Sequence, residues 1–450
     1  MIPCFALFLL GVGTCLVTGH SLVWALSLGL VLFSLLALRR GYQPRQVAAM
    51  AWEKGREALI VVPVFLIIGA VTALWRASGT ISFFLYYGLR AIPPAAFVAA
   101  AFLLSAALSF VLGTSYGVTG TAGLVLITLA RSGGVDLAVT AGAVLSGAYF
   151  GDRCSPMSSC ASLVAAVTKT DLYGNVRKML RTAALPTVLS VGIYAALSVR
   201  HPIASVDPAV LAALSEEFSL QWYVLLPAAL MLVLPLFRIP VKKAMALSAL
   251  AALALTVLLQ GLPLWEALRA ALLGYVPDSQ ELAAILSGGG VVSMVESSAV
   301  VFLTSLYAGI LEGIHALAPA EAWAERLADR VGLFPATALV SIGVLAVFCN
   351  QAVTVMLDAQ LMGECYRRRG ASRRELAMDI ADSGVTIAGL IPWSIALTVP
   401  LHMLGVGLEA VPWAVLVYLI PLCYLPTKRF FRAGQNRPQD LGRSCPAERI

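Results

Sequence analysis

A charged break inside an apolar run constrains this chain more than any other feature of its sequence. Residues 142–168 form two hydrophobic arms around the segment Gly151-Asp152-Arg153-Cys154-Ser155-Pro156. Pro156 has no backbone donor and disfavours helical geometry at Ser155, so a helix is expected to open here. If the arms lie in a bilayer, charge at that depth costs a few kcal/mol and usually lines a cavity or pathway. Opened backbone is tolerated there only against protein or water, so the break is our first candidate for a site.

Composition places these arms in a membrane. The chain has 450 residues, of which 60% are hydrophobic and 12% are charged, whereas roughly 25% of a soluble domain is charged. Apolar segments of spanning length recur throughout, and several are too short to cross alone. We therefore predict an all-α polytopic membrane protein of about 11–13 transmembrane spans with broken or re-entrant helices. The apolar run from Ile2 is interpreted as a first transmembrane helix rather than a signal peptide.

The remaining composition excludes other classes. The formal charge is +7, but Lys and Arg form short clusters between apolar runs, which does not indicate nucleic-acid binding. Eight cysteines show no CxxC or Cys/His spacing for a metal, and we expect reduced packing residues and no cofactor. The predicted partner is the lipid bilayer of the plasma membrane.

Basic clusters predict the orientation, because cytoplasmic loops are rich in Lys and Arg. The predicted organisation is an N-terminal helical hairpin and cytoplasmic loop (1–57), a first transport repeat (58–199), a linker and connecting helix (200–240), a second transport repeat (241–426) and a basic cytoplasmic tail (427–450).

The two repeats resemble each other at a displacement of 236 positions. Gly113-Thr114-Ser115-Tyr116 then meets Cys349-Asn350-Gln351-Ala352, and Pro156 and Ser158 meet Pro392 and Ser394. The charges invert: residues 131–134 carry one Arg whereas 366–375 carry five, and the basic loop 169–182 corresponds to 405–418, which has no Lys or Arg. Opposite charge bias predicts two inverted-topology repeats, the architecture of secondary transporters with a site at the repeat interface.

Oxygen-bearing side chains gather at these breaks. Hard cations take carboxylate, hydroxyl and carbonyl oxygens, and a buried carboxylate can bind a proton and a cation in turn, which produces antiport. One predicted wall of the site consists of Asp152, Ser155, Ser158, Ser159, Thr114 and Ser115. The other consists of Asn350, Gln351, Asp382 and Thr386. Sodium is assigned to Asp152 and Asp382, and the possible proton carriers are Asp152, Asp358, Asp382 and Glu296.

Each assignment has a structural alternative. Asp152 could form an ion pair with Arg153, and Asn350 and Gln351 could simply bond neighbouring helices. Asp358 could face a cytoplasmic vestibule, and Asp382 could be interfacial. Glu296 follows Ser287-Gly288-Gly289-Gly290, and as a buried carboxylate it would be either a proton carrier or tied to a backbone donor.

These motifs resemble the NhaC-type sodium/proton antiporters of the ion-transporter superfamily. The segment 151–158 followed by Thr170-Asp171-Leu172 is similar to the family's GDxxSPxSD…TDL signature. Further matches occur in order at Ile68-Gly69-Ala70, Trp75 to Thr80, Gly113-Thr114-Ser115, Asn350-Gln351 and Leu390-Ile391-Pro392-Trp393. The resemblance spans most of 58–410 and implies an inverted-repeat fold with re-entrant helices and cation/proton exchange, or, as in some relatives, transport of organic anions or amino acids.

The chain departs from the family pattern at two positions. Ser159 stands where the family usually has Asp, and Ser394 stands where Asn is common. A site with one carboxylate fewer suits an organic anion or amino acid, whose carboxylate would meet Arg153 or a half-helix N-terminus. A proton- or sodium-coupled transporter of such a solute is therefore the alternative function.

Two other classes receive less support. Gly113-Thr114-Ser115-Tyr116-Gly117 matches the GxSxG elbow of serine hydrolases. An intramembrane hydrolase would also need a histidine base near Ser115, and the four histidines fall near segment ends. A channel would require rings of charge or an oligomeric signature, which the sequence lacks.

Overall fold

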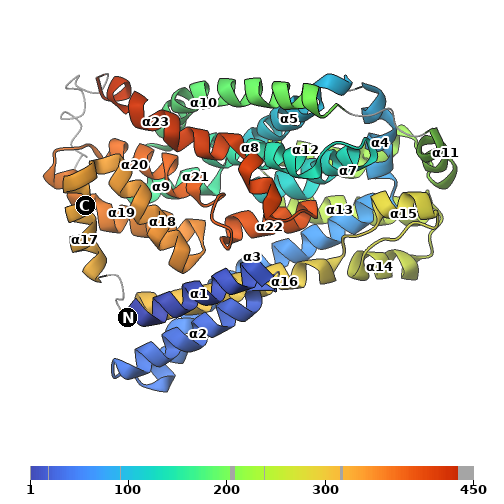
Figure 1. Ribbon diagram of the computed structural model, residues 1–450. Coiled ribbons are helices and arrows are strands. Elements are labelled where there is room, and N and C mark those ends of the chain that lie inside the picture. Colours follow the sequence, from blue (N-terminus) through green and yellow to red (C-terminus); the bar gives the residue numbers. More distant parts are fainter. Residues whose placement is uncertain are drawn as a thin grey trace, which may run out of the picture.

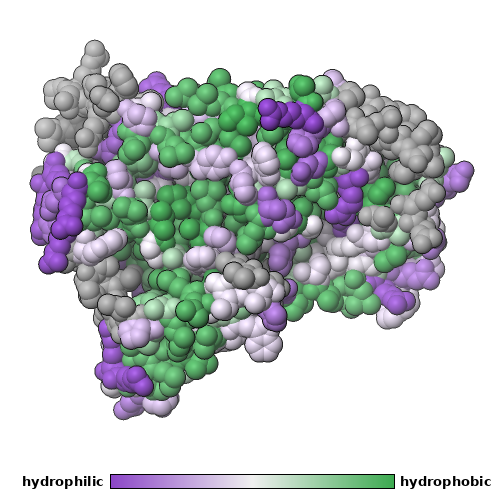
Figure 2. Space-filling view, in the orientation of Figure 1, coloured by the Kyte–Doolittle hydropathy of each residue, from purple (hydrophilic) through white to green (hydrophobic). Residues whose placement is uncertain are grey.

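The protein is helical throughout the part that its structure describes, which comprises residues 2–18, 20–91, 93–202, 208–237, 239–314 and 318–433 of a computed structural model (Figure 1). Within these residues, pairing of β type is confined to an isolated bridge between Tyr275 and Gly288. Figure 2 shows broad apolar surface over the middle of the molecule. Trp24, Trp222 and Leu258 are more than two-thirds exposed, which is typical of surface that faces lipid. The prediction of an all-α membrane protein is confirmed.

The N-terminal helices form a group with a helix from the second half. This group contains α1 (Ile2–Thr18), α2 (Leu22–Arg39), α3 (Pro44–Ala77) and α16 (Val295–Gly313). In Figure 1, α1 and α2 lie at the lower left, and α3 and α16 extend from them toward the middle. The helix α3 begins at Pro44, within the predicted N-terminal unit of residues 1–57. Proline at the first helical position and a capping box between Gln43 and Gln46 start the helix there.

Two successions of helices make up the rest of the core. The first comprises α5 (Phe97–Leu112), α6 (Ser115–Val118), the π-helical turn η2 (Thr119–Gly123), α7 (Leu124–Ser132), α8 (Leu137–Cys154), α9 (Ser159–Thr168) and α10 (Leu172–Arg200). The second comprises α18 (Leu333–Phe348), α19 (Gln351–Arg368), α20 (Arg373–Asp382), α21 (Gly384–Ile387), α22 (Ile395–Leu404), η5 (Leu408–Trp413) and α23 (Val415–Ala433).

Helix ends in these two successions coincide at the displacement of 236. The bounds of α18 and α22 are those of α5 and α9 shifted by that number, and α19 covers the positions of α6, η2 and α7 together. Left-handed residues recur as Gly113 and Cys349, Gly134 and Gly370, and Lys169 and Gly405. N-caps recur as Thr114 and Asn350, Asp136 and Ser372, and Ser158 and Ser394. The backbone therefore turns at matching places in both.

The two successions differ in continuity. The helix α8 runs unbroken to Cys154, whereas the corresponding stretch is divided at Ser383 (φ −121°, ψ −83°) into α20 and α21. The helix α10 is continuous over 29 residues, whereas its counterpart is divided into η5 and α23.

The other helices connect these parts. They are α4 (Thr80–Ala91), η1 (Pro94–Ala96), α11 (Pro208–Glu217), η3 (Trp222–Leu225), α12 (Leu226–Leu236), α13 (Val241–Leu258), α14 (Leu264–Leu273), α15 (Gln280–Leu286), η4 (Val291–Met294) and α17 (Ala318–Val331). Of the predicted basic tail, residues 434–450 lie outside the described part of the chain.

Helix length separates spanning from broken segments. In the described residues, Leu22–Arg39, Leu172–Arg200 and Val291–Gly313 are each long and apolar enough to cross a bilayer. A fourth span results if α3 and α4, bent by 60° at their junction, count together. At about 1.5 Å per residue, helices such as α5 are shorter than a hydrocarbon core of about 30 Å. The predicted total of about 11–13 spans stays a prediction.

Candidate functional site

The two helix breaks of the first succession lie against each other. After Leu112, Gly113 adopts the left-handed conformation (φ 66°) and Thr114 caps α6. A Cβ on Gly113 would lie 2.4 Å from the backbone carbonyl carbon of Met157 and 2.7 Å from the nitrogen of Ser158. Glycine is required here both for its positive φ and for this close contact between main chains.

Small residues hold α8 against α5. A Cβ on Gly151 would lie 2.0 Å from the carbonyl carbon of Ser109, and one on Gly147 would lie 2.5 Å from the oxygen of Phe102. Glycines four residues apart let two membrane helices approach to backbone contact. This packing brings the last turn of α8, which carries Asp152, beside the break at Gly113.

Asp152 is buried among neutral hydrogen-bonding groups. Its side chain is only 4% exposed. The Ser115 hydroxyl donates to Oδ2 at 3.5 Å, and the Ser158 hydroxyl lies 3.4 Å from Oδ1 and donates to the main-chain oxygen of Asp152. Ser158 also accepts from the amides of Cys160 and Ala161 as the N-cap of α9. One serine therefore joins the carboxylate to the start of the next helix.

The second succession reaches this site through Gln351. The Cys160 thiol donates to Gln351 Oε1 at 3.1 Å, and Gln351 Nε2 donates to the Val385 carbonyl at 2.8 Å. Gln351 and Cys160 also interact with the carboxylate of Asp152. The structure therefore brings together Asp152, Ser115, Ser158 and Gln351, and Cys160 is a contact that sequence reasoning did not assign to the site.

Four other predicted residues have different local roles. The Ser155 hydroxyl donates to the Phe110 carbonyl at 2.5 Å and ties the loop to α5. Thr114 accepts from the Gly117 amide, and Asn350 accepts from the amides of Ala352 and Val353, so both are helix caps. Ser159, in the position where the sequence analysis noted a missing carboxylate, is exposed.

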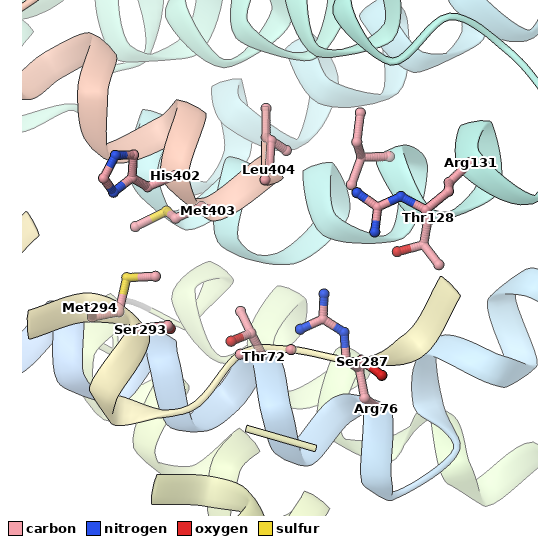
Figure 3. Close-up of a pocket in the computed structure, with 14 residues that line it drawn as sticks. Thr72, Arg76, Thr128, Arg131, Ser287, Ser293, Met294, His402, Met403 and Leu404 are labelled. Atoms are coloured by element: carbon pink, nitrogen blue, oxygen red, sulfur yellow. The ribbon is translucent and has the colours of Figure 1, made fainter. Parts of the chain in front are cut away.

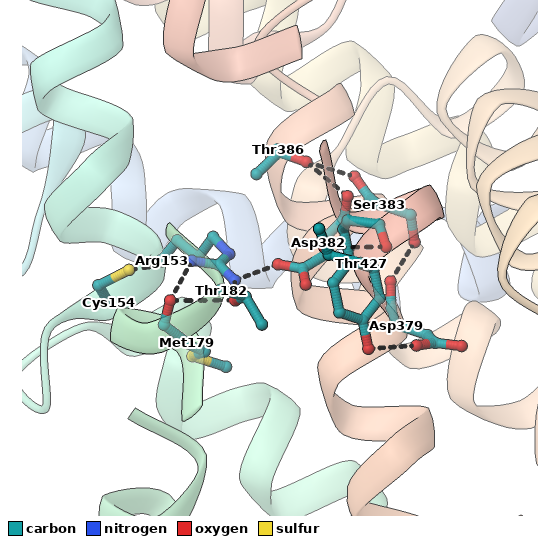
Figure 4. A network of polar contacts seen from close by, with 10 residues as sticks. Arg153, Cys154, Met179, Thr182, Asp379, Asp382, Ser383, Thr386 and Thr427 are labelled. Carbon is teal, nitrogen blue, oxygen red and sulfur yellow. Dashed lines mark hydrogen bonds and ion pairs between the residues drawn. The ribbon is translucent and has the colours of Figure 1, made fainter. Parts of the chain in front are cut away.

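Arg153 pairs with Asp382 rather than with its neighbour Asp152. Both side chains are fully buried, and the guanidinium also donates to Thr182 Oγ1 at 2.6 Å and to the Met179 carbonyl at 2.9 Å (Figure 4). The alternative of an Asp152–Arg153 ion pair is therefore wrong, whereas the depth of Asp382 in the membrane stays a prediction. The pair joins α8, which carries Arg153, to α20, which carries Asp382, although the two residues lie 229 positions apart in the chain. The bonds to Met179 and Thr182 add α10 to this contact. Asp382 Oδ2 has no hydrogen-bond partner among the described residues.

Thr386 follows Asp382 by one helical turn. Its hydroxyl donates to the main-chain oxygens of Asp382 at 3.1 Å and Ser383 at 3.2 Å, so it satisfies carbonyls at the division between α20 and α21 (Figure 4).

Asp358 occupies a separate buried position on α19. The Ser341 hydroxyl donates to its Oδ2 at 2.6 Å, and its Oδ1 has no hydrogen-bond partner within the described chain. A Cβ on Gly384 would lie 2.5 Å from Oδ2, so the carboxylate is packed directly against α21. The alternative that Asp358 faces a vestibule is wrong, because the side chain is fully buried.

Glu296 lies outside this cluster. The expectation of a buried carboxylate is wrong, because Glu296 is exposed at the start of α16 and accepts a hydrogen bond from the Ser21 hydroxyl. It follows the 3₁₀ turn η4, which brings its side chain to the surface beside α2. A role for Glu296 as a proton carrier stays a prediction.

Sequence reasoning missed a second charged network, centred on Asp379. Lys428 forms ion pairs with Asp379 and, at 3.0 Å, with Glu375. The Tyr424 hydroxyl donates to Asp379 Oδ1 at 3.0 Å, and Tyr366 donates to Oδ2. Glu375, Asp379 and Asp382 follow one another by four and three residues on α20, a helical spacing that could have identified an acidic face. The partner Lys428, 49 positions away, carries no local signal.

In the described residues, no group of three or more His, Cys, Asp or Glu side chains could hold a metal ion. A cation at Asp152 would therefore need hydroxyl, amide and carbonyl oxygens beside the one carboxylate. Ser115 and Ser158 offer hydroxyl oxygens, and Gln351 offers an amide oxygen.

Buried carboxylates at interrupted helices of a membrane protein are typical of secondary transporters, and Ser115 of the GxSxG segment hydrogen bonds Asp152. A family model described as "Na+/H+ antiporter family" matches residues 2–161 and 147–427. The chain belongs to the Na+/H+ antiporter family.

Curated relatives cover most of the chain. A malate-2H(+)/Na(+)-lactate antiporter of Bacillus subtilis (strain 168) is 28% identical over 401 residues, which is 86% of each protein. A protein of Haemophilus influenzae that is described as an uncharacterized Na(+)/H(+) antiporter is 27% identical over 81% of each chain. The Na(+)/H(+) antiporter NhaC of Alkalihalophilus pseudofirmus is 26% identical over 80% of each chain.

Proposed function

We propose that the protein exchanges Na+ for protons across the plasma membrane and that the two cations compete for Asp152. The observation that carries this proposal is a buried carboxylate at the meeting point of interrupted helices whose recorded partners are all uncharged. An uncompensated carboxylate in a membrane is costly to keep, and such groups mark ion pathways.

The neighbouring groups suit both cations. A proton on Asp152 leaves a neutral acid that donates to or accepts from Ser115 and Ser158. When the proton leaves, the carboxylate and the oxygens of Ser115, Ser158 and Gln351 can replace water around Na+. Because one carboxylate binds either cation, entry of one requires release of the other, and exchange follows.

The scaffold that we propose for this exchange is a pair of inverted repeats. Its support is the agreement of helix bounds, caps and left-handed residues at a displacement of 236, together with the inverted charge of the loops. The basic residues near Lys169 and Arg367 and the tail after Lys428 would then be cytoplasmic. Access would alternate between the two sides of the interface that contains Asp152 and Gln351.

The other carboxylates have distinct proposed roles. Asp382 holds the two repeats together through Arg153. Its Oδ2 has no hydrogen-bond partner among the described residues, which leaves an oxygen for the predicted sodium contact. Asp358 is a second proton carrier, since one of its oxygens also has no partner in the described chain.

The decisive test is Asp152→Asn in everted membrane vesicles. The substitution keeps the shape but removes the charge and one of the two acceptor oxygens, so we expect loss of sodium-dependent dequenching of a pH-sensitive dye. Asp136→Asn is the matched control: Asp136 is exposed and caps α8, and Asn is an equally good N-cap. Wild-type exchange by Asp152→Asn at normal expression would contradict the proposal.

The second candidate is a coupled transporter of a small organic anion or amino acid. A cavity lined by Arg76 and Arg131 favours this second function. Arg153 was predicted to bind the carboxylate of such a substrate, but it is paired with Asp382 and does not fill that role. Uptake of labelled carboxylic and amino acids into proteoliposomes, with and without a sodium gradient, separates the two functions.

A further inference from the structure

A cavity of about 160 Å³ lies between α3, α7, α22 and the loop before α16 (Figure 3). Arg76 from α3 and Arg131 from α7 line it from opposite sides, and their guanidinium groups point toward each other across the space. Arg131 is exposed, whereas Arg76 is 7% exposed. The cavity therefore leads from the surface to a buried cation.

The positive charge of this cavity is uncompensated. No Asp or Glu belongs to its lining, which the described residues supply entirely. Arg76 Nε is buried without a hydrogen-bond partner in the described part of the protein. Two guanidiniums that line the same cavity repel each other, and burial of Arg76 without an acidic partner is costly. An anion bound between them would relieve both costs.

The two guanidinium groups are the donors of this lining. The hydroxyls of Thr72 and Ser293 already donate to the carbonyls of Gly69 and Gly290, at 2.8 and 2.7 Å, and the amide of Gly288 donates to the Tyr275 carbonyl. A guanidinium presents paired N–H groups that match a carboxylate, so two of them suit a small carboxylate anion better than a halide.

A second cavity, of about 360 Å³, is lined by residues that correspond to part of the first lining but carries different charges. Lining positions 127, 128 and 131 of the first correspond at the displacement of 236 to 363, 364 and 367 of the second, and 403–405 correspond to 167–169. Arg131 thus corresponds to Arg367, but Thr128 corresponds to Glu364. Glu364 accepts two hydrogen bonds from Arg367, at 2.6 and 2.7 Å. Exposed Lys169 and Arg373 also line the second cavity, which contains no buried arginine.

We propose that the cavity between Arg76 and Arg131 binds a small carboxylate anion. The site is separate from Asp152 and does not depend on the proposed cation exchange. In the orientation proposed above, it opens on the side opposite to the Arg367 cluster.

Binding of succinate to the purified protein in nanodiscs tests this assignment by titration calorimetry. Succinate, sulfate and chloride are added as N-methyl-D-glucamine salts, so that no sodium accompanies the anion. We expect saturable succinate binding that is stronger than that of sulfate or chloride. Arg131→Gln should weaken it at least about tenfold, because a charge-assisted bidentate contact is lost.

Matched variants separate this role from a general effect of charge. Arg367→Gln, at the corresponding position of the second cavity, should leave succinate affinity within about twofold, because Arg367 is already paired with Glu364. Thr128→Glu, which copies Glu364 into the first cavity, should abolish binding. Asp152→Asn should bind succinate as the wild type does, so failure of the exchange proposal leaves this one intact.

Three outcomes would overturn the proposal: no saturable succinate binding by the wild type, equal losses from Arg131→Gln and Arg367→Gln, or tighter binding of sulfate or chloride than of succinate. Because Arg131 is exposed, its substitution should not prevent folding, and the melting temperature without anion verifies this. Arg76→Gln gives a second reading from the buried side of the cavity.

Discussion

The two halves of the core share a backbone plan but not their charges. Helix ends, caps and left-handed residues of the stretch from α5 to α10 recur 236 positions later. The buried charged residues of these helices do not recur: Asp152 corresponds to Ala388, Arg153 to Gly389, Asp358 to Ala122 and Asp382 to Ser146. A helix end depends on a few neighbouring residues, whereas a charge is retained only where its surroundings use it. Each half therefore supplies different groups to a common frame.

The largest effect that tests this comparison concerns the ion pair between the halves. Arg153→Gln leaves Asp382 as a buried charge without its partner, which should cost about 3–5 kcal/mol of unfolding free energy. Arg153→Met combined with Asp382→Leu should regain most of this loss, because well-packed apolar residues can replace a buried pair. Denaturation with sodium dodecyl sulfate measures both. A single variant as stable as the wild type would show that the pair does not join the halves.

A smaller effect is expected at the two left-handed helix ends. Gly113→Ala places a Cβ 2.4 Å from backbone of Met157 in a conformation that disfavours side chains, and should cost at least about 2 kcal/mol. Cys349 already carries a Cβ at φ 54°, so Cys349→Ala loses only the thiol and its contact with Tyr307, about 1 kcal/mol. The apparent melting temperature should therefore fall further for Gly113→Ala than for Cys349→Ala. Equal losses would mean that the two breaks are packed alike.

The smallest effect distinguishes a helix cap from a ligand. Ser158→Ala and Ser394→Ala each remove the N-cap of corresponding helices, α9 and α22, and each should cost about 1 kcal/mol. Only Ser158 also contacts Asp152, so only Ser158→Ala should raise the sodium concentration for half-maximal exchange. Vesicle assays over a sodium series measure this. A similar shift in Ser394→Ala would mean that both serines act only as helix caps.

The sequence by itself determined the membrane class and the positions of the breaks. Pro156 and Pro392 and the polar breaks at Gly113 and Asn350 were identified in the sequence, and each lies within a few residues of a helix end. Such local signals can be interpreted without tertiary structure, because they act through the main chain of their immediate neighbours. The displacement of 236 also followed from the sequence alone.

Only the tertiary structure decided which charges meet. Arg153 pairs with Asp382 and not with the adjacent Asp152, and Lys428 pairs with Asp379. Arg76 faces Arg131 across a cavity. It also placed two residues at exposed positions: Ser159, which was predicted to line the site, and Glu296, which was predicted as a possible proton carrier. The physical reason is that the partner of a buried charge depends on how distant helices pack, and no pattern along one helix encodes the side chains of another.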